Sequence, residues 1–169
     1  GLAEELGVSS GVDFQMGTLS KAAGLSGGYV ACSRAWADVM INSARSLIYS
    51  TAPPPALAAA ALAAVRIISG EEGKALRRHV SALAEALSAA LGTPGRPVSS
   101  LFPVVIGENE AALSAAQRLL EQGFLAPAIR YPTVPRGTAR LRLTVTAAHQ
   151  PEQIEAPGKR LAELPRSPY

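Results

Sequence analysis

The chain has 169 residues, a formal net charge of +3 and a pI of about 9.4. This length fits one domain or one domain plus part of another, and 48% hydrophobic residues allow a sizeable core. The positive charge lies on scattered arginines rather than in a basic run, which argues against a nucleic-acid partner. One cysteine, Cys32, excludes a disulfide framework, and the two histidines lack neighbours at metal-ligand spacing, so no metal site is expected.

No segment has the composition of a membrane span or a signal peptide. The longest apolar stretch, residues 56–68, is short and rich in alanine, and residues 1–5 lack a basic-then-apolar profile. We therefore expect a cytoplasmic protein without a membrane partner. The chain begins with Gly1 rather than Met, which agrees with the C-terminal piece of a longer protein.

In the first half of the chain, short strands precede helices. Apolar runs separated by a loop with several glycines predict strands at 12–18 and 29–32. Hydrophobic periodicity predicts helices at 34–46, 56–69 and 71–91, with the prolines at 53–55 breaking the chain before the second helix.

In the second half, strands and helices alternate after a Pro-, Gly- and Ser-rich connector at 92–100. The pattern predicts strand 101–106, helix 109–122 with Asn109 as its N-cap, strand 124–129, strand 138–146 and a helix at 150–164 interrupted at 156–158. In strand 138–146, hydrophobic residues alternate with polar ones, as in a half-buried strand. The core face would carry Leu141, Leu143 and Val145, and the polar face Arg140, Arg142 and Thr144.

Lys21 follows the first predicted strand and precedes several glycines. A strand end gives a catalytic lysine a rigid base, and glycines allow a cofactor to approach the backbone closely. The hydroxyls of Thr18 and Ser20 flank the amine and suit a phosphate. The segment alone does not show whether Lys21 binds a cofactor, because most lysines beside such loops are solvated surface residues.

Several blocks of the sequence, in order, resemble the α-oxoamine synthases, which are fold-type-I pyridoxal-phosphate enzymes. The lysine block runs from Thr18 through Ser20, Lys21 and Gly24 to Ala31. Further blocks lie at 45–55, at 128–143 and at 146–149, so the resemblance covers most of residues 11–154. It implies an α/β fold. Residues 1–55 would be the end of the large cofactor-binding domain, 56–92 connecting helices, and 93–169 a small α+β C-terminal domain.

The resemblance implies an enzyme with pyridoxal 5'-phosphate (PLP) as its cofactor. It is nearest to the members that condense L-alanine with pimeloyl-CoA or a pimeloyl-carrier protein to give 8-amino-7-oxononanoate in biotin biosynthesis. Another member type is the alternative: glycine C-acetyltransferase, 5-aminolevulinate synthase or serine palmitoyltransferase. A further alternative is an inactive fragment that acts only as a dimerisation module.

The family's functional residues fall on matching positions of this chain. Lys21 would bind PLP covalently and move the substrate proton, and Thr18 would bind the PLP phosphate. Ser50 and Thr51 match residues that reach this phosphate from a neighbouring subunit, which implies a homodimer. The substrate-binding matches are Arg142 for the amino-acid carboxylate, Arg130 near it, and Thr133 at the acyl substrate.

Structural roles remain open for several of these residues. One of Arg140 and Arg142 is expected only to cover the sheet, and Arg130 could instead be a surface residue at a strand end. Ser50 and Thr51 could instead cap the next helix. We expect His149 to lie at a helix start or to pack against its neighbours, and His79 to be solvated. Cys32 is expected to be a small, buried hydrophobic residue.

The resemblance also has gaps. No residue matches the family's acid at the cofactor ring nitrogen or its ring-stacking histidine, and Asp13 lies in the strand before the lysine rather than at the acid's place. We therefore expect the 169 residues alone to be inactive or nearly so. The tail 164–169 also departs from the family.

Overall fold

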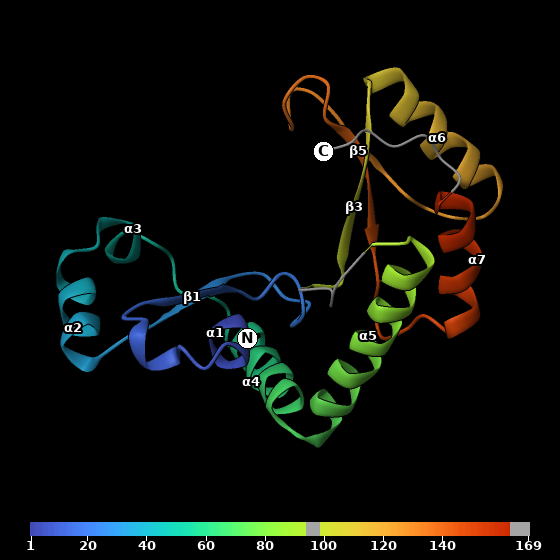
Figure 1. Cartoon of the computed structure of the whole chain (residues 1–169). Helices are drawn as coiled ribbons and strands as arrows, with labels where there is room; N and C mark the ends of the chain where they lie inside the picture. The colour runs from blue at the N-terminus through green and yellow to red at the C-terminus, as the bar shows by residue number, and fades with distance from the viewer. Residues whose placement is uncertain (94–98, 163–169) are drawn as a thin grey trace. The chain divides into compact units, whose positions relative to one another are not determined.

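The computed structural model describes residues 1–93 and 99–162 (Figure 1). The chain forms two compact units, residues 1–73 and 74–169, and the boundary falls in the first turn of helix α5, Glu71–Ala90. The tail predicted to depart from the family lies outside the described residues, as does most of the predicted connector at 92–100.

A two-stranded hairpin is the only sheet of the first unit. Strand β1, Gln15–Thr18, pairs antiparallel with β2, Gly28–Ala31, so that Gly17 lies opposite Tyr29. A Cβ built on Gly17 would lie 2.5 Å from the Tyr29 ring, so the ring occupies the space that a side chain would need. Both predicted strands are present, but β1 begins at Gln15 rather than at residue 12, because the chain bends at Asp13 and residues 12–14 have no strand pairing.

Four helices complete the first unit: α1 Leu2–Glu5, α2 Arg34–Ser43, α3 Arg45–Ile48 and α4 Pro55–Ser69. The hydroxyl of Ser33 caps α2 by accepting the Trp36 N–H at 3.4 Å. The single helix predicted at 34–46 is wrong, because Ala44, with ψ of 99°, leaves the helical region and starts α3. Pro55 opens α4 at its first position, as the prolines allow.

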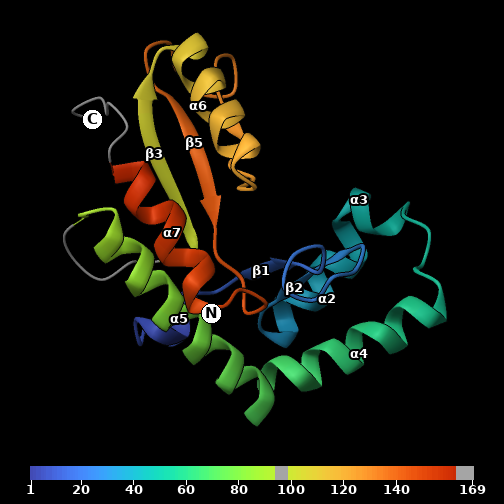
Figure 2. The ribbon, with the colours of Figure 1, turned by 90° about the vertical axis from the view of Figure 1, so that its right-hand side faces the viewer.

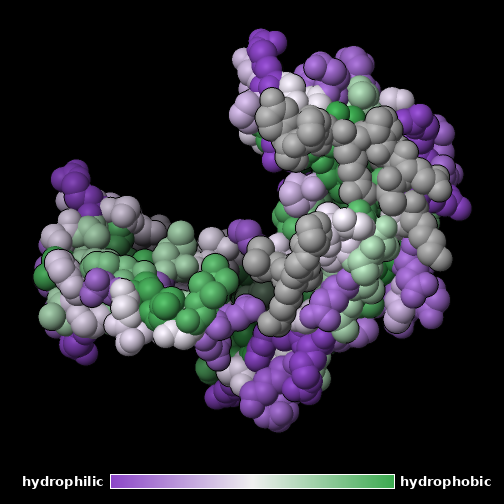
Figure 3. Space-filling model, viewed as in Figure 1, coloured by the Kyte–Doolittle hydropathy of each residue, from purple (hydrophilic) through white to green (hydrophobic). Residues whose placement is uncertain are grey.

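The first unit exposes much of its hydrophobic surface. Gly73 is the only buried residue among residues 1–73, and Met16 and Tyr49 are each 74% exposed. Hydrophobic side chains gather on the visible face of this unit in Figure 3. Exposed apolar surface on this scale is typical of a face that other polypeptide covers. Cys32, just past β2, is half-buried, so the prediction of a buried cysteine is wrong.

The second unit is built on an antiparallel sheet of three strands. These are β3 Leu101–Gly107, β4 Ala128–Ile129 and β5 Ala139–Thr144, in the order β3-β5-β4. Figure 2 shows β3 and β5 side by side. The predicted alternation in β5 is confirmed: Leu141, Leu143 and the following Val145 are buried, and Arg142 is exposed. The strand predicted at 124–129 shortens to two residues.

Helix α5, helix α6, Asn109–Glu121, and helix α7, Pro151–Ala162, contribute to one hydrophobic core with the sheet. Residues such as Leu87, Leu119, Leu141 and Leu161 form this core. The opposite face of the sheet stays open and carries Arg142. The fold thus separates a packed face from a face that carries the two arginines of β5.

Two details of the helices differ from prediction. The N-cap of α6 is Glu108 rather than Asn109, and no side chain caps it. Helix α7 runs through Pro157 without a break. A proline within a helix costs about 3 kcal/mol. The burial of Ile154 and Leu161 on either side of Pro157 offsets that loss. No helix in the described part of the chain is long and apolar enough to cross a membrane.

Candidate active site

Lys21 lies on the turn of residues 19–27 that joins β1 to β2. The Leu19 N–H donates to the Gly27 carbonyl at 2.9 Å, and the Leu25 N–H donates to the Leu19 carbonyl at 2.8 Å. Gly24 and Gly27 have φ of 67° and 114°, a region that favours glycine. The turn is therefore closed by its own backbone, and it holds Lys21 just beyond the end of a strand.

The amine of Lys21 is held by a neighbouring hydroxyl. Its Nζ donates to Thr18 Oγ1 at 3.1 Å, and both side chains are exposed. This donor set fits PLP, because it offers an amine for the cofactor's aldehyde carbon beside a hydroxyl that can also donate to a phosphate oxygen. Among the described residues, no group of three or more His, Cys, Asp or Glu could hold a metal ion.

Ser50 and Thr51 lie exposed between α3 and α4. The Ser50 N–H donates to the Leu47 carbonyl at 3.2 Å. The alternative that these hydroxyls cap the next helix is wrong, because the N-cap of α4 is Pro54 and no side chain caps it. Within the described part of the chain, neither hydroxyl has a hydrogen bond, and none joins them to Lys21.

The two arginines of β5 have different surroundings. Arg140 is half-buried, and its Nε donates to the Thr138 carbonyl at 3.0 Å. Arg142 is exposed; its backbone N–H donates to the Pro127 carbonyl at 2.9 Å, while its guanidinium makes no hydrogen bond within the described residues. Arg140 is thus the arginine engaged by the protein itself, and Arg142 is the one that presents its charge to solvent.

Arg130 and Thr133 share the loop between β4 and β5. The Arg130 carbonyl accepts the Thr133 N–H at 2.9 Å, and both side chains are exposed. The Tyr131–Pro132 peptide bond is cis. The structure thus brings Lys21 together with Thr18 in the first unit, and Arg130 together with Thr133 in the second.

Both histidines have structural contacts. His149 Nδ1 accepts the Thr146 N–H at 3.0 Å, just before α7, in agreement with its predicted place at a helix start. The His79 Nε2 donates to the His149 carbonyl at 3.2 Å. The prediction that His79 is solvated is wrong, since its side chain is half-buried by this contact.

Residues 2–161 match the family model Aminotransferase class I and II. The chain belongs to the aminotransferase class I and II family. One relative in this family, the 8-amino-7-oxononanoate synthase of Methylobacterium nodulans, is 48% identical over 159 residues, which are 94% of this chain and 41% of that protein. The corresponding synthase of Methylocella silvestris is 52% identical over 143 residues, which are 85% of this chain and 40% of that protein. The chain thus spans about two fifths of the length of these relatives.

Solved structures in this family share the fold. A high-resolution structure of SPT with PLP internal aldimine superposes with a TM-score of 0.85 at 28% identity, over 96% of this chain and 42% of that chain. The serine palmitoyltransferase of Sphingomonas wittichii superposes with a TM-score of 0.84 at 27% identity, over 95% of this chain and 42% of that chain. An 8-amino-7-oxononanoate synthase from Francisella tularensis, at 23% identity and a TM-score of 0.72 over 88% and 44%, supports the fold alone. The predicted fold-type-I α/β class is confirmed.

Proposed function

We propose that the protein to which this chain belongs is a PLP-dependent acyltransferase. It would condense L-alanine with a pimeloyl thioester, release CO₂ and the free thiol of CoA or the carrier protein, and yield 8-amino-7-oxononanoate for biotin biosynthesis. The observation that carries the proposal is the hydrogen bond from Lys21 Nζ to Thr18 Oγ1 at the end of β1. The relatives named 8-amino-7-oxononanoate synthase, at 48% and 52% identity, support this choice of substrates.

Lys21 would carry both the cofactor bond and the proton transfer. Bound PLP supplies an electron-withdrawing ring that stabilises negative charge at the amino-acid Cα. Lys21 Nζ, freed when the amino acid takes its place, accepts the Cα proton and later returns a proton to the product. Thr18 Oγ1 accepts a hydrogen bond from Nζ beside the strand end, and its O–H would donate a hydrogen bond to a phosphate oxygen of the cofactor.

The substrate would be oriented by side chains of the second unit. Arg142 offers a planar, permanently charged fork from a rigid strand, which suits a bidentate hold on the alanine carboxylate. Arg130 would add positive charge near that carboxylate, and Thr133 would contact the acyl chain.

Dimerisation would complete the phosphate site. We propose that Ser50 and Thr51 reach the PLP phosphate of a second copy in a homodimer. Their exposed hydroxyls, without hydrogen bonds in the described part of the chain, and the exposed hydrophobic surface of the first unit support this role. The same surface supports the proposal that residues 1–55 are the end of a larger domain, followed by connecting helices at 56–92 and a small domain at 93–169.

The test uses this chain joined to the remaining portion of the Methylobacterium nodulans relative, hereafter the extended protein. It is offered alanine with pimeloyl-CoA or a pimeloyl-carrier protein, glycine with acetyl-CoA or succinyl-CoA, and serine with palmitoyl-CoA. We expect kcat/KM for alanine with a pimeloyl thioester to exceed the others by at least about tenfold, a difference of about 1.4 kcal/mol. Preference for serine and palmitoyl-CoA would instead support the serine palmitoyltransferase type.

A matched variant shows whether residues of this chain carry the reaction. Lys21→Ala in the extended protein removes the amine that binds PLP and moves the proton, so turnover should fall by about 10³-fold or more. Full turnover in Lys21→Ala would contradict the proposed function.

A further inference from the structure

The loop between β4 and β5 is closed by a stack of two of its own side chains. The guanidinium carbon of Arg136 lies 4.2 Å from the centroid of the Tyr131 ring, well within the range of a cation–π interaction. The two residues are five positions apart, so the chain between them must fold back for the stack to form. Thr133 lies within this closed segment.

The rest of the loop is held by short backbone bonds. Thr133 and Val134 N–H groups both donate to the Arg130 carbonyl, at 2.9 and 3.3 Å, and the Thr138 N–H donates to the Pro135 carbonyl at 3.2 Å. These two sets of bonds lie at opposite ends of the loop. Within the described residues, the Arg136–Tyr131 stack is the side-chain contact that joins one end to the other.

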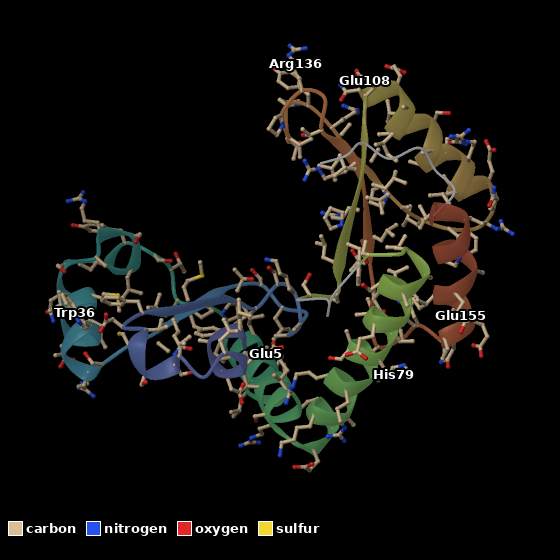
Figure 4. All side chains as sticks on the ribbon, in the orientation of Figure 1. Glu5, Trp36, His79, Glu108, Arg136 and Glu155 are labelled. Carbon is tan, nitrogen blue, oxygen red and sulfur yellow. The ribbon has the colours of Figure 1, made fainter. Side chains whose placement is uncertain are left out.

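Tyr131 and Arg136 also face open space beside the start of α6. A cavity of about 460 Å³ lies between the loop and the start of α6, lined by Tyr131 and Arg136 on one side and by Glu108 and Glu110 on the other. Figure 4 places Arg136 and Glu108 at the same end of the unit. The carboxylates of Glu108 and Glu110 favour the positive charge of Arg136 at this position. The contact that fixes the loop's conformation is the stack of Arg136 on Tyr131.

We infer that Arg136 is a positioning residue for the acyl substrate: its stack on Tyr131 fixes the loop conformation in which Thr133 is presented. The inference rests on the proposed function, in which Thr133 contacts the acyl chain. The planar guanidinium of arginine stacks on an aromatic face better than the compact ammonium of lysine. A lysine at 136 should therefore recover only part of the effect.

The experiment compares Arg136→Met, Tyr131→Leu, their double variant and Arg136→Lys in the extended protein. Exposed cation–π contacts are modest, so we expect the KM for pimeloyl thioester to rise about two- to fivefold in each single variant. The KM for alanine and kcat should not change. Because both substitutions break one contact, the double variant should match a single variant rather than multiply the two effects. Arg118→Met, an exposed arginine on α6, is the control and should leave all constants unchanged.

A second readout does not depend on turnover. Hydrogen exchange of the Thr133, Val134 and Thr138 amides in the extended protein should quicken about two- to fivefold in Arg136→Met and Tyr131→Leu, less in Arg136→Lys, and not in Arg118→Met. Unchanged exchange would overturn the claim that the stack holds the loop. Quickened exchange with an unchanged acyl KM, or an equal rise in the KM for alanine, would overturn its role in acyl positioning. Absence of turnover in the unsubstituted extended protein would overturn the proposed function, and with it the role of Arg136 in acyl positioning. The exchange rates would still show whether the Arg136–Tyr131 stack holds the loop.

Discussion

The amine of Lys21 and the hydroxyl of Thr18 are 3.1 Å apart, three residues from each other across the end of β1. The strand fixes Thr18, and the closed turn fixes Lys21, so the pair meets without help from any other element. The same hydroxyl can accept from the amine and donate to an anion. One short segment would therefore provide both the covalent anchor and a phosphate contact in the cofactor site that we propose.

Thr18→Val should weaken PLP binding to the extended protein. The change keeps the shape of the side chain but removes the hydroxyl that accepts from Lys21 Nζ. A net loss of about 1 kcal/mol corresponds to a dissociation constant raised about fivefold. Titration followed by cofactor absorbance measures it, with Ser10→Ala, an exposed hydroxyl in the Ser9–Gly11 turn, as the control. An unchanged affinity of Thr18→Val for PLP would show that Thr18 does not contribute to the cofactor site.

Arg142→Ala should impair use of the amino acid without affecting folding. Loss of a bidentate contact to a carboxylate, about 3 kcal/mol, should raise the KM for alanine by about 10²-fold. The free energy of unfolding should change by no more than about 0.5 kcal/mol, because the side chain is exposed. Steady-state kinetics and urea unfolding of the extended protein check both.

Arg140→Ala is the matched comparison on the same strand face. Its guanidinium bonds the Thr138 carbonyl, so its loss should lower the free energy of unfolding by about 1 kcal/mol. The KM for alanine should change far less than in Arg142→Ala. The reverse ranking of the two variants would assign the carboxylate to Arg140 instead.

Gly158→Ala should destabilise the second unit. A Cβ at Gly158 in α7 would lie 2.5 Å from the Cβ of Ala90 in α5, and both helices contribute to the core. Overpacking of this kind costs about 1–3 kcal/mol. Urea unfolding of the extended protein measures the loss, and adding Ala90→Gly should recover part of it by restoring the space. Glu155→Ala, on the exposed side of α7, is the control. An equally large loss of unfolding free energy in Glu155→Ala would show that any substitution in α7 destabilises the unit, and that the contact with Ala90 is not the cause.

Gly17→Ala should disturb the hairpin that carries Lys21. The new Cβ would meet the end of the Tyr29 ring at 2.5 Å, so the ring must swing away. Since Tyr29 is 54% exposed and its ring can move, we expect a loss of about 1 kcal/mol in the free energy of unfolding and weaker PLP binding. Adding Tyr29→Leu should relieve the clash. If Gly17→Ala binds PLP normally, the ring's position has no bearing on the site.

Local sequence patterns predicted most elements of the second unit. The alternation of Leu141 and Leu143 with Arg140 and Arg142 determined which face of β5 is buried, because a strand with one buried face repeats every two residues. The break at Ala44 and the continuity of α7 through Pro157 were missed. Both depend on tertiary packing and backbone geometry that a helical pattern does not encode.

Contacts that follow no periodic sequence pattern were also missed. The Arg136–Tyr131 stack was hidden because a loop has no periodicity, although an aromatic residue and an arginine flanking a Pro-rich segment are a usable signal. The approach of Tyr29 to Gly17 follows from strand register, which the sequence alone did not fix. In contrast, the pairing of Lys21 with Thr18 was predictable, since it is local.

The most direct test of the account asks which lysine binds PLP covalently. The extended protein is incubated with PLP, reduced with borohydride and digested, and the peptides are searched by mass spectrometry for the pyridoxyl group. Lysines in this chain are Lys21, Lys74 and Lys159. We predict stoichiometric labelling at Lys21 and none at the other two. Equal labelling of the three, or none at Lys21, would contradict the assignment of this hairpin as the cofactor site.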